Sequence, residues 1–263
     1  MKKSITHLAI VLASLVFFAG IISPALGGWT DSLKKVFSSG AGASSEASSQ
    51  PAAGDSGANL SDSEMNSGIK EALHQAVNTA IASLGQENGY LGNDLVKIAM
   101  PEKLTRAESL LRTVGQGKLV DQFVESMNRA AEKAVPKTTG ILGKAVTSMS
   151  LEDAAKILQG EDNAATQYFE QKTREELFAE IKPVVEEATD TAMVTSYYKN
   201  MMGKVGTSLP LLQSYSPDLD QYVTDKALDG LFVIMAQEEK KIRENPAART
   251  TDLLKKVFGY FGG

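Results

Sequence analysis

Few side chains in this sequence are of types that do chemistry. Glu71 and His74 have the Glu-x-x-His spacing that places a carboxylate and an imidazole on one face of a helix, as in di-iron bundles. Those bundles use two such pairs, whereas the sequence offers one, because the other histidine is His7 near the N-terminus. The sequence has no cysteine, which excludes disulfides, thiol catalysis and cysteine-ligated zinc. We therefore predict no metal site, no cofactor and no catalytic residue.

One set of polar residues lies in or near alanine-rich segments such as RAAEKA at 129–134. Small residues let helices approach closely, so charges are less expected there than on a solvated face. We interpret the set as a candidate polar groove between helices that recognises a ligand or a partner. The alternative is that they form ion pairs on solvated helix faces, each worth about 0.3–0.5 kcal/mol. The set consists of Asn128, Arg129, Glu132, Asp225, Lys226, Asp229, Glu239 and Arg243.

The elements that must position these residues are helices. Residues 60–263 are predicted to form a single all-α domain of about eight helices, with either one core or two lobes. Ser61 and Glu64 form a capping box at the start of the first helix. Pro136 and Pro183 are each predicted to break a helix, because proline lacks the backbone donor.

Two further segments refine this prediction. The last long helix is predicted from Leu219 to Glu244, because the residue before Pro246 avoids the helical region. The sequence VKIAMP at 96–101 alternates apolar and polar residues, which is typical of a short extended piece. No second strand pattern in the sequence offers it a partner.

The first 27 residues have the pattern of a cleaved signal peptide. Lys2 and Lys3 precede the apolar run at 8–19, and small residues follow at 23–27, with cleavage expected after Ala25 or Gly27. Export to the periplasm follows, and a lipoprotein anchor is excluded by the lack of cysteine. Residues 38–59 are serine, alanine and glycine with few charges, so we predict a disordered linker with a span of about 25 Å.

A short amphipathic segment at 28–37 contains TDSLKKVF, which is nearly identical to TDLLKKVF at 251–258. Seven of the eight positions agree, and the apolar residues recur at i, i+3 and i+4. A helix this short is marginal in water, so each copy is expected to dock on something, the second on its own domain. The first copy could dock on an equivalent surface, displace the second copy or enter a membrane interface, or the likeness could be convergence. The candidate docking or membrane-contact residues are Trp29, Leu33, Val36, Phe37, Leu254, Val257 and Phe258.

The charge of the chain argues against nucleic acid as a partner. Without residues 1–27 the chain loses two lysines and keeps 25 basic and 32 acidic residues, a formal charge of −7. A nucleic-acid binder needs a basic surface that neutralises phosphates.

Five ordered blocks of the sequence resemble a family of exported bacterial proteins known by a domain-of-unknown-function label. The resemblance implies an exported, mainly helical domain and implies no activity. The blocks are GIKEAL (68–73), MNRAAE (127–132), DAAKILQG with AATQYF (153–169), YVTDKALDGLF (222–232) and EEKKIRENPAARTTDLLKKVFG (238–259).

These observations favour an exported, non-catalytic, helical interaction protein of the bacterial envelope. Its expected partner is an envelope protein, a second copy of itself or the membrane surface. The alternative is a small-molecule binder or an enzyme that uses carboxylates in the candidate polar groove, with Glu132 and Glu239 as acid and base. That alternative requires the two carboxylates to converge in one cleft.

Overall fold

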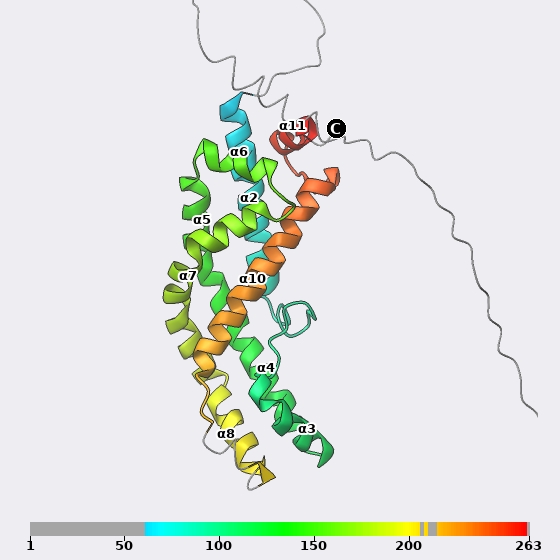
Figure 1. Ribbon diagram of the computed structural model, residues 1–263, viewed down its shortest axis with the longest axis vertical. Coiled ribbons are helices and arrows are strands. Elements are labelled where there is room, and N and C mark those ends of the chain that lie inside the picture. The colour runs from blue at the N-terminus through cyan, green and yellow to red at the C-terminus, as the bar shows by residue number, and fades with distance from the viewer. Residues whose placement is uncertain (1–60, 206–207, 210–214, 262–263) are drawn as a thin grey trace, which may run out of the picture. The chain divides into compact units, whose positions relative to one another are not determined.

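The structure is a computed structural model that describes residues 61–205, 208–209 and 215–261 (Figure 1). The chain divides into two units, Met1–Gly54 and Asp55–Gly263, and every described residue belongs to the second. The predicted signal peptide, the 28–37 segment and the linker at 38–59 lie outside the described residues.

The described residues form an all-α structure and contain no strand, which confirms the predicted fold class. They group into one compact unit, so the two-lobed alternative is not needed. Three short 3₁₀ segments, η1 (Glu102–Leu104), η2 (Val135–Thr138) and η4 (Pro246–Ala248), connect some of the α-helices. The α-helices are α2 (Asp62–Leu84), α3 (Thr105–Thr113), α4 (Gly117–Ala134), α5 (Thr139–Ser148), α6 (Leu151–Gln159), α7 (Ala164–Thr191), α8 (Val194–Val205), α10 (Leu219–Glu244) and α11 (Asp252–Phe261).

Several helix ends follow the local sequence signals. Ser61 and Glu64 form the predicted capping box at the start of α2. Helix α4 ends at Ala134, two residues before Pro136, and α10 spans the predicted residues Leu219–Glu244. The predicted break at Pro183 is wrong, because α7 continues through this proline to Thr191.

The core lies along α10, which packs against α7, α2 and α4, while α4 also packs against α7 and α8. Buried apolar side chains such as Phe123, Phe169, Leu177 and Leu231 fill the space between these helices. Within the helical unit, α3 and α8 lie at one end and α6 and α11 at the other (Figure 1). In the part of the chain that the structure describes, no helix combines the length and the apolar character needed to cross a bilayer.

Candidate functional site

The eight residues predicted to line one polar groove lie in three separate clusters. Asn128, Arg129 and Glu132 project from α4 towards the loop that follows α2. Asp225, Lys226 and Asp229 lie on α10, where the two aspartates meet Arg174 of α7 and Lys226 pairs with Asp229. Glu239 and Arg243 lie near the end of α10 and meet the junction of α6 and α7.

In the first cluster, Glu132 holds the loop that follows α2. One oxygen of its carboxylate accepts hydrogen bonds from the backbone N–H groups of Tyr90 (3.1 Å) and Leu91 (3.2 Å). The other oxygen pairs with Arg129 at 2.8 Å, and Arg129 also donates to the side chain of Asn88. The Glu132 side chain is 5% exposed, so the surface ion-pair interpretation is wrong for this residue.

The buried side chain of Tyr90 anchors that loop in the core. Its hydroxyl donates to the carbonyl of Ala227 on α10 at 2.6 Å. A Cβ atom at Gly230 would lie 2.7 Å from the Tyr90 ring, so the glycine makes room for the tyrosine. Burial and the nearby charges of Glu132 and Asp229 raise the pKa of Tyr90 well above its ordinary value. The hydroxyl therefore stays protonated and acts as a donor.

Asn128 supplies the partner that the extended piece at 96–101 lacked in the sequence. Its side-chain oxygen accepts from the N–H of Ile98 at 2.8 Å, and its amide nitrogen donates to the carbonyl of Ile98 at 2.9 Å. The amide also donates to the carbonyl of Val124 at 2.7 Å. A side-chain amide thus replaces a neighbouring strand, and Asn128 is fully buried.

The second cluster is a partly exposed ion-pair network between α7 and α10. Arg174 pairs with Asp229 at 2.6 Å and approaches Asp225 at 3.8 Å, while Lys226 pairs with Asp229 at 3.0 Å. Burial opposes ionisation of Asp229, but hydrogen bonds from Arg174 and Lys226 outweigh it and lower the pKa of its carboxyl. Arg174 also pairs with Glu170 on its own helix at 2.9 Å. Sequence patterns did not indicate that it would meet Asp225 and Asp229, because these lie far from it along the chain.

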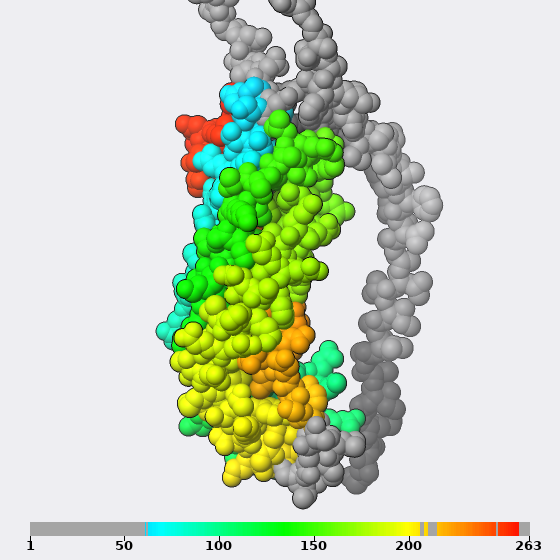
Figure 2. Space-filling model, turned by 90° about the vertical axis from the view of Figure 1, so that its left-hand side faces the viewer, coloured from blue at the N-terminus to red at the C-terminus, as the bar shows by residue number. Residues whose placement is uncertain are grey.

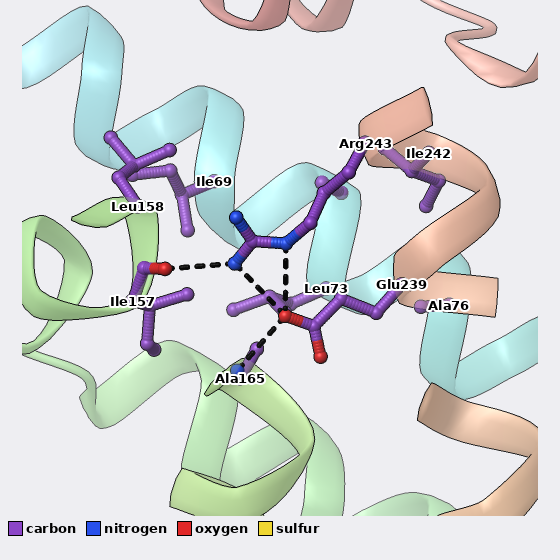
Figure 3. Close-up of a pocket in the computed structure, with 10 residues that line it drawn as sticks. Ile69, Leu73, Ala76, Ile157, Leu158, Ala165, Glu239, Ile242 and Arg243 are labelled. Carbon is purple, nitrogen blue, oxygen red and sulfur yellow. Dashed lines mark hydrogen bonds and ion pairs between the residues drawn. The ribbon is translucent and has the colours of Figure 1, made fainter. Parts of the chain in front are cut away.

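In the third cluster, Glu239 caps the start of α7 from a different helix (Figure 3). Its carboxylate accepts from the N–H groups of Ala165 (3.0 Å) and Thr166 (2.9 Å) and from the Thr166 hydroxyl. Helix α7 has no side-chain cap of its own at Asn163, so Glu239 satisfies donors that would otherwise be orphaned. Arg243 pairs with Glu239 at 3.0 Å and donates to the carbonyl of Ile157 near the end of α6 at 2.8 Å.

This arrangement does not bring Glu132 and Glu239 together as an acid and base pair. The two carboxylates bind the backbones of different segments, and each is already occupied by N–H donors and an arginine. Ala227, whose carbonyl accepts from the Tyr90 hydroxyl, lies twelve residues before Glu239, which corresponds to about 18 Å along the helix. Glu239 is 6% exposed, so the surface ion-pair interpretation is also wrong here.

Two spaces in the structure differ in their capacity to hold a ligand. A mostly apolar cavity of about 20 Å³ lies between α2, α6, α7 and α10, beside Glu239 and Arg243 (Figure 3). This volume is enough for about one water molecule. A cleft of about 440 Å³ lies between α3, α4 and the loop that follows α2. Its size suits a small ligand. Its charged residues, none of which was among the predicted site residues, are Lys97, Glu108, Arg112, Asp121 and Glu125.

The C-terminal copy of the repeated sequence packs on its own domain, as predicted. Helix α11 lies beside the first turns of α2 in both views of the molecule (Figures 1 and 2). Leu254 and Val257 are fully buried, and Leu254 clusters with Ala72 and Ala76 of α2 and Ile242 of α10. We call the surface that receives this helix the α11 contact surface, and it consists of Glu64, Gly68, Ala72, Ala76 and Ile242.

Close approach of the two helices depends on Gly68. A Cβ atom there would lie 2.5 Å from Cγ2 of Val257 and 3.4 Å from Cγ of Leu253, so a larger residue would push α11 away. The Thr251 hydroxyl caps α11 by accepting from the N–H of Leu254 at 3.2 Å. The contact is therefore specific for a small residue on α2 and for the apolar stripe of α11.

Polar contacts hold the middle of α11 and the segment that precedes it. Lys256 pairs with Glu64 at 2.7 Å. Before the helix, the guanidinium of Arg249 donates to the carbonyls of Ile242 (3.1 Å) and Arg243 (2.9 Å), and the Thr250 hydroxyl donates to Gln75 at 2.8 Å. Arg249 was not among the predicted site residues, although it is buried.

We expect the titration of Glu64 to report whether α11 is docked. The hydrogen bond from Lys256, followed by those from Ser61, lowers the pKa of Glu64 to about 2 from its ordinary value of 4.5. A lowered pKa in the folded state favours docking at pH above 4.5, and this contribution is lost as the pH falls through about 2. In Lys256→Met, NMR titration of the Glu64 carboxyl should give a higher midpoint than in the unaltered chain.

The neighbouring lysine provides the control for that titration. Lys255 pairs with Asp252 at 3.1 Å within α11. Lys255→Met should therefore leave the Glu64 midpoint unchanged. An equal rise in both variants would show that general charge, and not the ion pair across the contact, sets the pKa of Glu64.

Comparison with known proteins identifies a family whose model matches this chain. A family model described as "Protein of unknown function (DUF4197)" matches residues 59–259, which include all three polar clusters and most of α11. No curated protein and no solved structure matches the chain.

Proposed function

Because the chain belongs to the DUF4197 family of proteins of unknown function, we propose a function from its own geometry. The chain is an exported, non-catalytic interaction protein of the bacterial envelope that binds a short amphipathic helix on the α11 contact surface. The observation that carries this proposal is the docking of a ten-residue helix, α11, against small residues of α2. Such a helix is marginal on its own, so its order depends on this contact.

The state of the carboxylates supports a non-catalytic role. Glu132, Glu239 and the amide of Asn128 are buried and bind backbone N–H groups of a loop, of the start of α7 and of the segment around Ile98. A general acid or base must reach a proton of the substrate. Carboxylates that bind the backbone of loops and helix ends stabilise the fold instead.

The location rests on the signal-peptide pattern at residues 1–27. Export predicts a mature chain that begins at Leu26 or Gly28 and is found in the periplasmic fraction. Intact-mass measurement of the purified protein gives the first residue directly. A chain that retains Met1 in the cytoplasm would remove the envelope from the proposal.

Helix recognition can be tested with a peptide that copies α11. A fluorescent peptide of residues 249–261 should bind the mature chain that lacks residues 28–37 and carries Leu254→Ala. The substitution weakens the resident helix by removing buried side-chain volume, and the deletion removes the similar segment TDSLKKVF as a second competitor. Binding to the unaltered chain should be about tenfold weaker or more, since α11 competes at the high effective concentration of a tethered segment. Fluorescence anisotropy measures both affinities.

Two matched variants decide what the peptide binds. Gly68→Val in the Leu254→Ala chain should weaken peptide binding by about tenfold or more, because the new side chain would overlap Val257. Gly140 also lies in a helix, but a Cβ atom there meets nothing within 4 Å, so Gly140→Val should leave binding unchanged. Equal affinities for both variants, or no binding to any chain, would contradict helix recognition at this surface.

The cleft beside α3 and α4 supports a second candidate function, the binding of a small molecule. Lys97 and Glu125 line it together with Met100 and Val124, so it combines charges of both signs with apolar surface. Amino acids are suitable probes because they carry both charges. NMR shifts of cleft residues with a dissociation constant below about 1 mM would support this function, and unchanged spectra would oppose it.

A further inference from the structure

We propose that residues 30–37 of the same chain are a second occupant of the α11 contact surface and exchange with α11. This inference rests on the proposed function and names the partner of that surface. The occupant is a segment outside the described residues, so the argument uses its sequence and the contacts that α11 makes. We call residues 30–37 the N-terminal copy.

The N-terminal copy repeats the side chains by which α11 is held. Leu33 and Val36 correspond to Leu254 and Val257, which are both fully buried in α11. The capping threonine recurs as Thr30. A surface that accepts one of these sequences therefore offers the same apolar contacts to the other.

The charged contact is repeated as well. Lys35 corresponds to Lys256, which pairs with Glu64 at 2.7 Å. Lys34 corresponds to Lys255, which pairs with Asp252 inside α11 and is 59% exposed. The two adjacent lysines of the N-terminal copy are thus expected to differ, with Lys35 facing α2 and Lys34 facing solvent.

The length of chain before α2 favours an intramolecular occupant. Residues 38–60 separate the N-terminal copy from the start of the described residues at Ser61. A linker of this composition spans about 25 Å, and Gly68 lies only about 10 Å along α2 from Ser61. A short flexible linker gives an effective concentration in the millimolar range, far above that of a second copy at micromolar protein.

Two differences make the N-terminal copy the weaker competitor. Ser32 replaces Leu253, whose side chain approaches Gly68, and Gly28 stands at the position of Arg249, which binds the carbonyls of Ile242 and Arg243. The resident α11 therefore occupies the surface in the structure. When α11 is withdrawn, the N-terminal copy takes its place and covers Ala72 and Ala76. The apolar face of α11 is then free to bind elsewhere.

Cross-linking can test this exchange because the sequence has no cysteine of its own. The mature chain with Glu64→Cys and Lys35→Cys is treated with a short bismaleimide, and the product is located by mass spectrometry. Weakening α11 with Leu254→Ala should raise the intramolecular yield about tenfold, because the competing helix has lost buried volume. Val257→Ala is a milder second variant in case the first reduces folding, and circular dichroism reports the helix content of each.

The adjacent lysine and the apolar residues provide the controls. Glu64→Cys with Lys34→Cys has the same linker but should show little of this rise, since position 34 faces away from α2. Adding Leu33→Asp and Val36→Asp should abolish the rise at position 35. Equal yields at positions 34 and 35, or a rise that survives the two aspartates, would overturn the proposal.

The remaining outcomes separate this inference from the function on which it rests. Cross-linked dimers whose yield grows with protein concentration would identify a second copy as the occupant and overturn the intramolecular form. Binding of the 249–261 peptide without any position-specific cross-link would keep helix recognition and remove the N-terminal copy as its partner. Failure of peptide binding and cross-linking together would remove both.

Discussion

Replacing Glu239 with alanine should lower the free energy of unfolding by about 3–5 kcal/mol, the usual result of breaking a buried ion pair by removing one partner. The N–H groups of Ala165 and Thr166 would lose their acceptor, and Arg243 would lose its counter-charge. For a domain of this size the loss corresponds to a Tm lower by about 10 °C. Thermal unfolding followed by circular dichroism measures this shift.

Another glutamate of α10 provides a matched control. Glu244 pairs with Lys240 on the surface and is 58% exposed. Glu244→Ala should therefore change the free energy of unfolding by less than about 1 kcal/mol. A near-neutral Glu239→Ala variant, or an equal loss in both, would show that the cap on α7 contributes little to stability.

Local signals in the sequence were sufficient for several helix ends. The capping box at Ser61 fixes a start because the side chain and the backbone donors it satisfies lie within one turn. The turn at Gly115 depends on a left-handed backbone, with φ of +74°, which glycine adopts without strain. Such features involve neighbouring residues alone, so spacing along the chain reveals them.

Pro183 shows where local reasoning failed. Proline removes one helical hydrogen bond and usually ends or kinks a helix. In α7, however, Leu177 and Ile181 before the proline and Val185 after it are all fully buried on one face. Their packing against α10 and α4 outweighs the local cost, and this packing cannot be read from the residues around the proline.

The polar residues were predicted to line one groove between helices, whereas the structure places them in three separate clusters. The backbone partners of Glu132 lie 41 and 42 residues before it, and those of Glu239 lie 73 and 74 before it. Helical spacing suggested the arginine partners three and four residues away, and both pairs are present. It gave no indication of the loop and helix ends that the same carboxylates hold.

The polar clusters and α11 differ in how much of the fold depends on them. Buried Asn128, Glu132 and Glu239 fix irregular segments to the central helices, and their loss would affect the whole domain. Helix α11 instead docks at the edge of the helical unit, mainly on α2. Elements that bind or exchange are drawn from the least stable part of a structure, which agrees with the proposed role of the α11 contact surface.

The amide of Asn128 allows a prediction with a distinct pH signature. In Asn128→Asp, the introduced carboxyl keeps an acceptor for the N–H of Ile98 but loses the donor to the carbonyls of Ile98 and Val124. A buried charge that faces two carbonyl oxygens should lower the free energy of unfolding at pH 7 by about 3 kcal/mol or more. Urea unfolding of this variant and the unaltered chain measures the difference.

The sign of the pH dependence follows from burial of the introduced carboxyl. Its pKa in the folded state would be raised above the unfolded value of about 3.9, so the loss is complete at neutral pH and shrinks as the pH falls towards 3.9. The protonated acid can donate to one carbonyl again, which restores part of the original pairing. Asn128→Ala leaves the same backbone groups without a partner but introduces no titrating group, so its loss relative to the unaltered chain should not change with pH. A pH-independent loss in Asn128→Asp would show that the introduced carboxyl reaches solvent, and that the segment around Ile98 is held less tightly than its hydrogen bonds indicate.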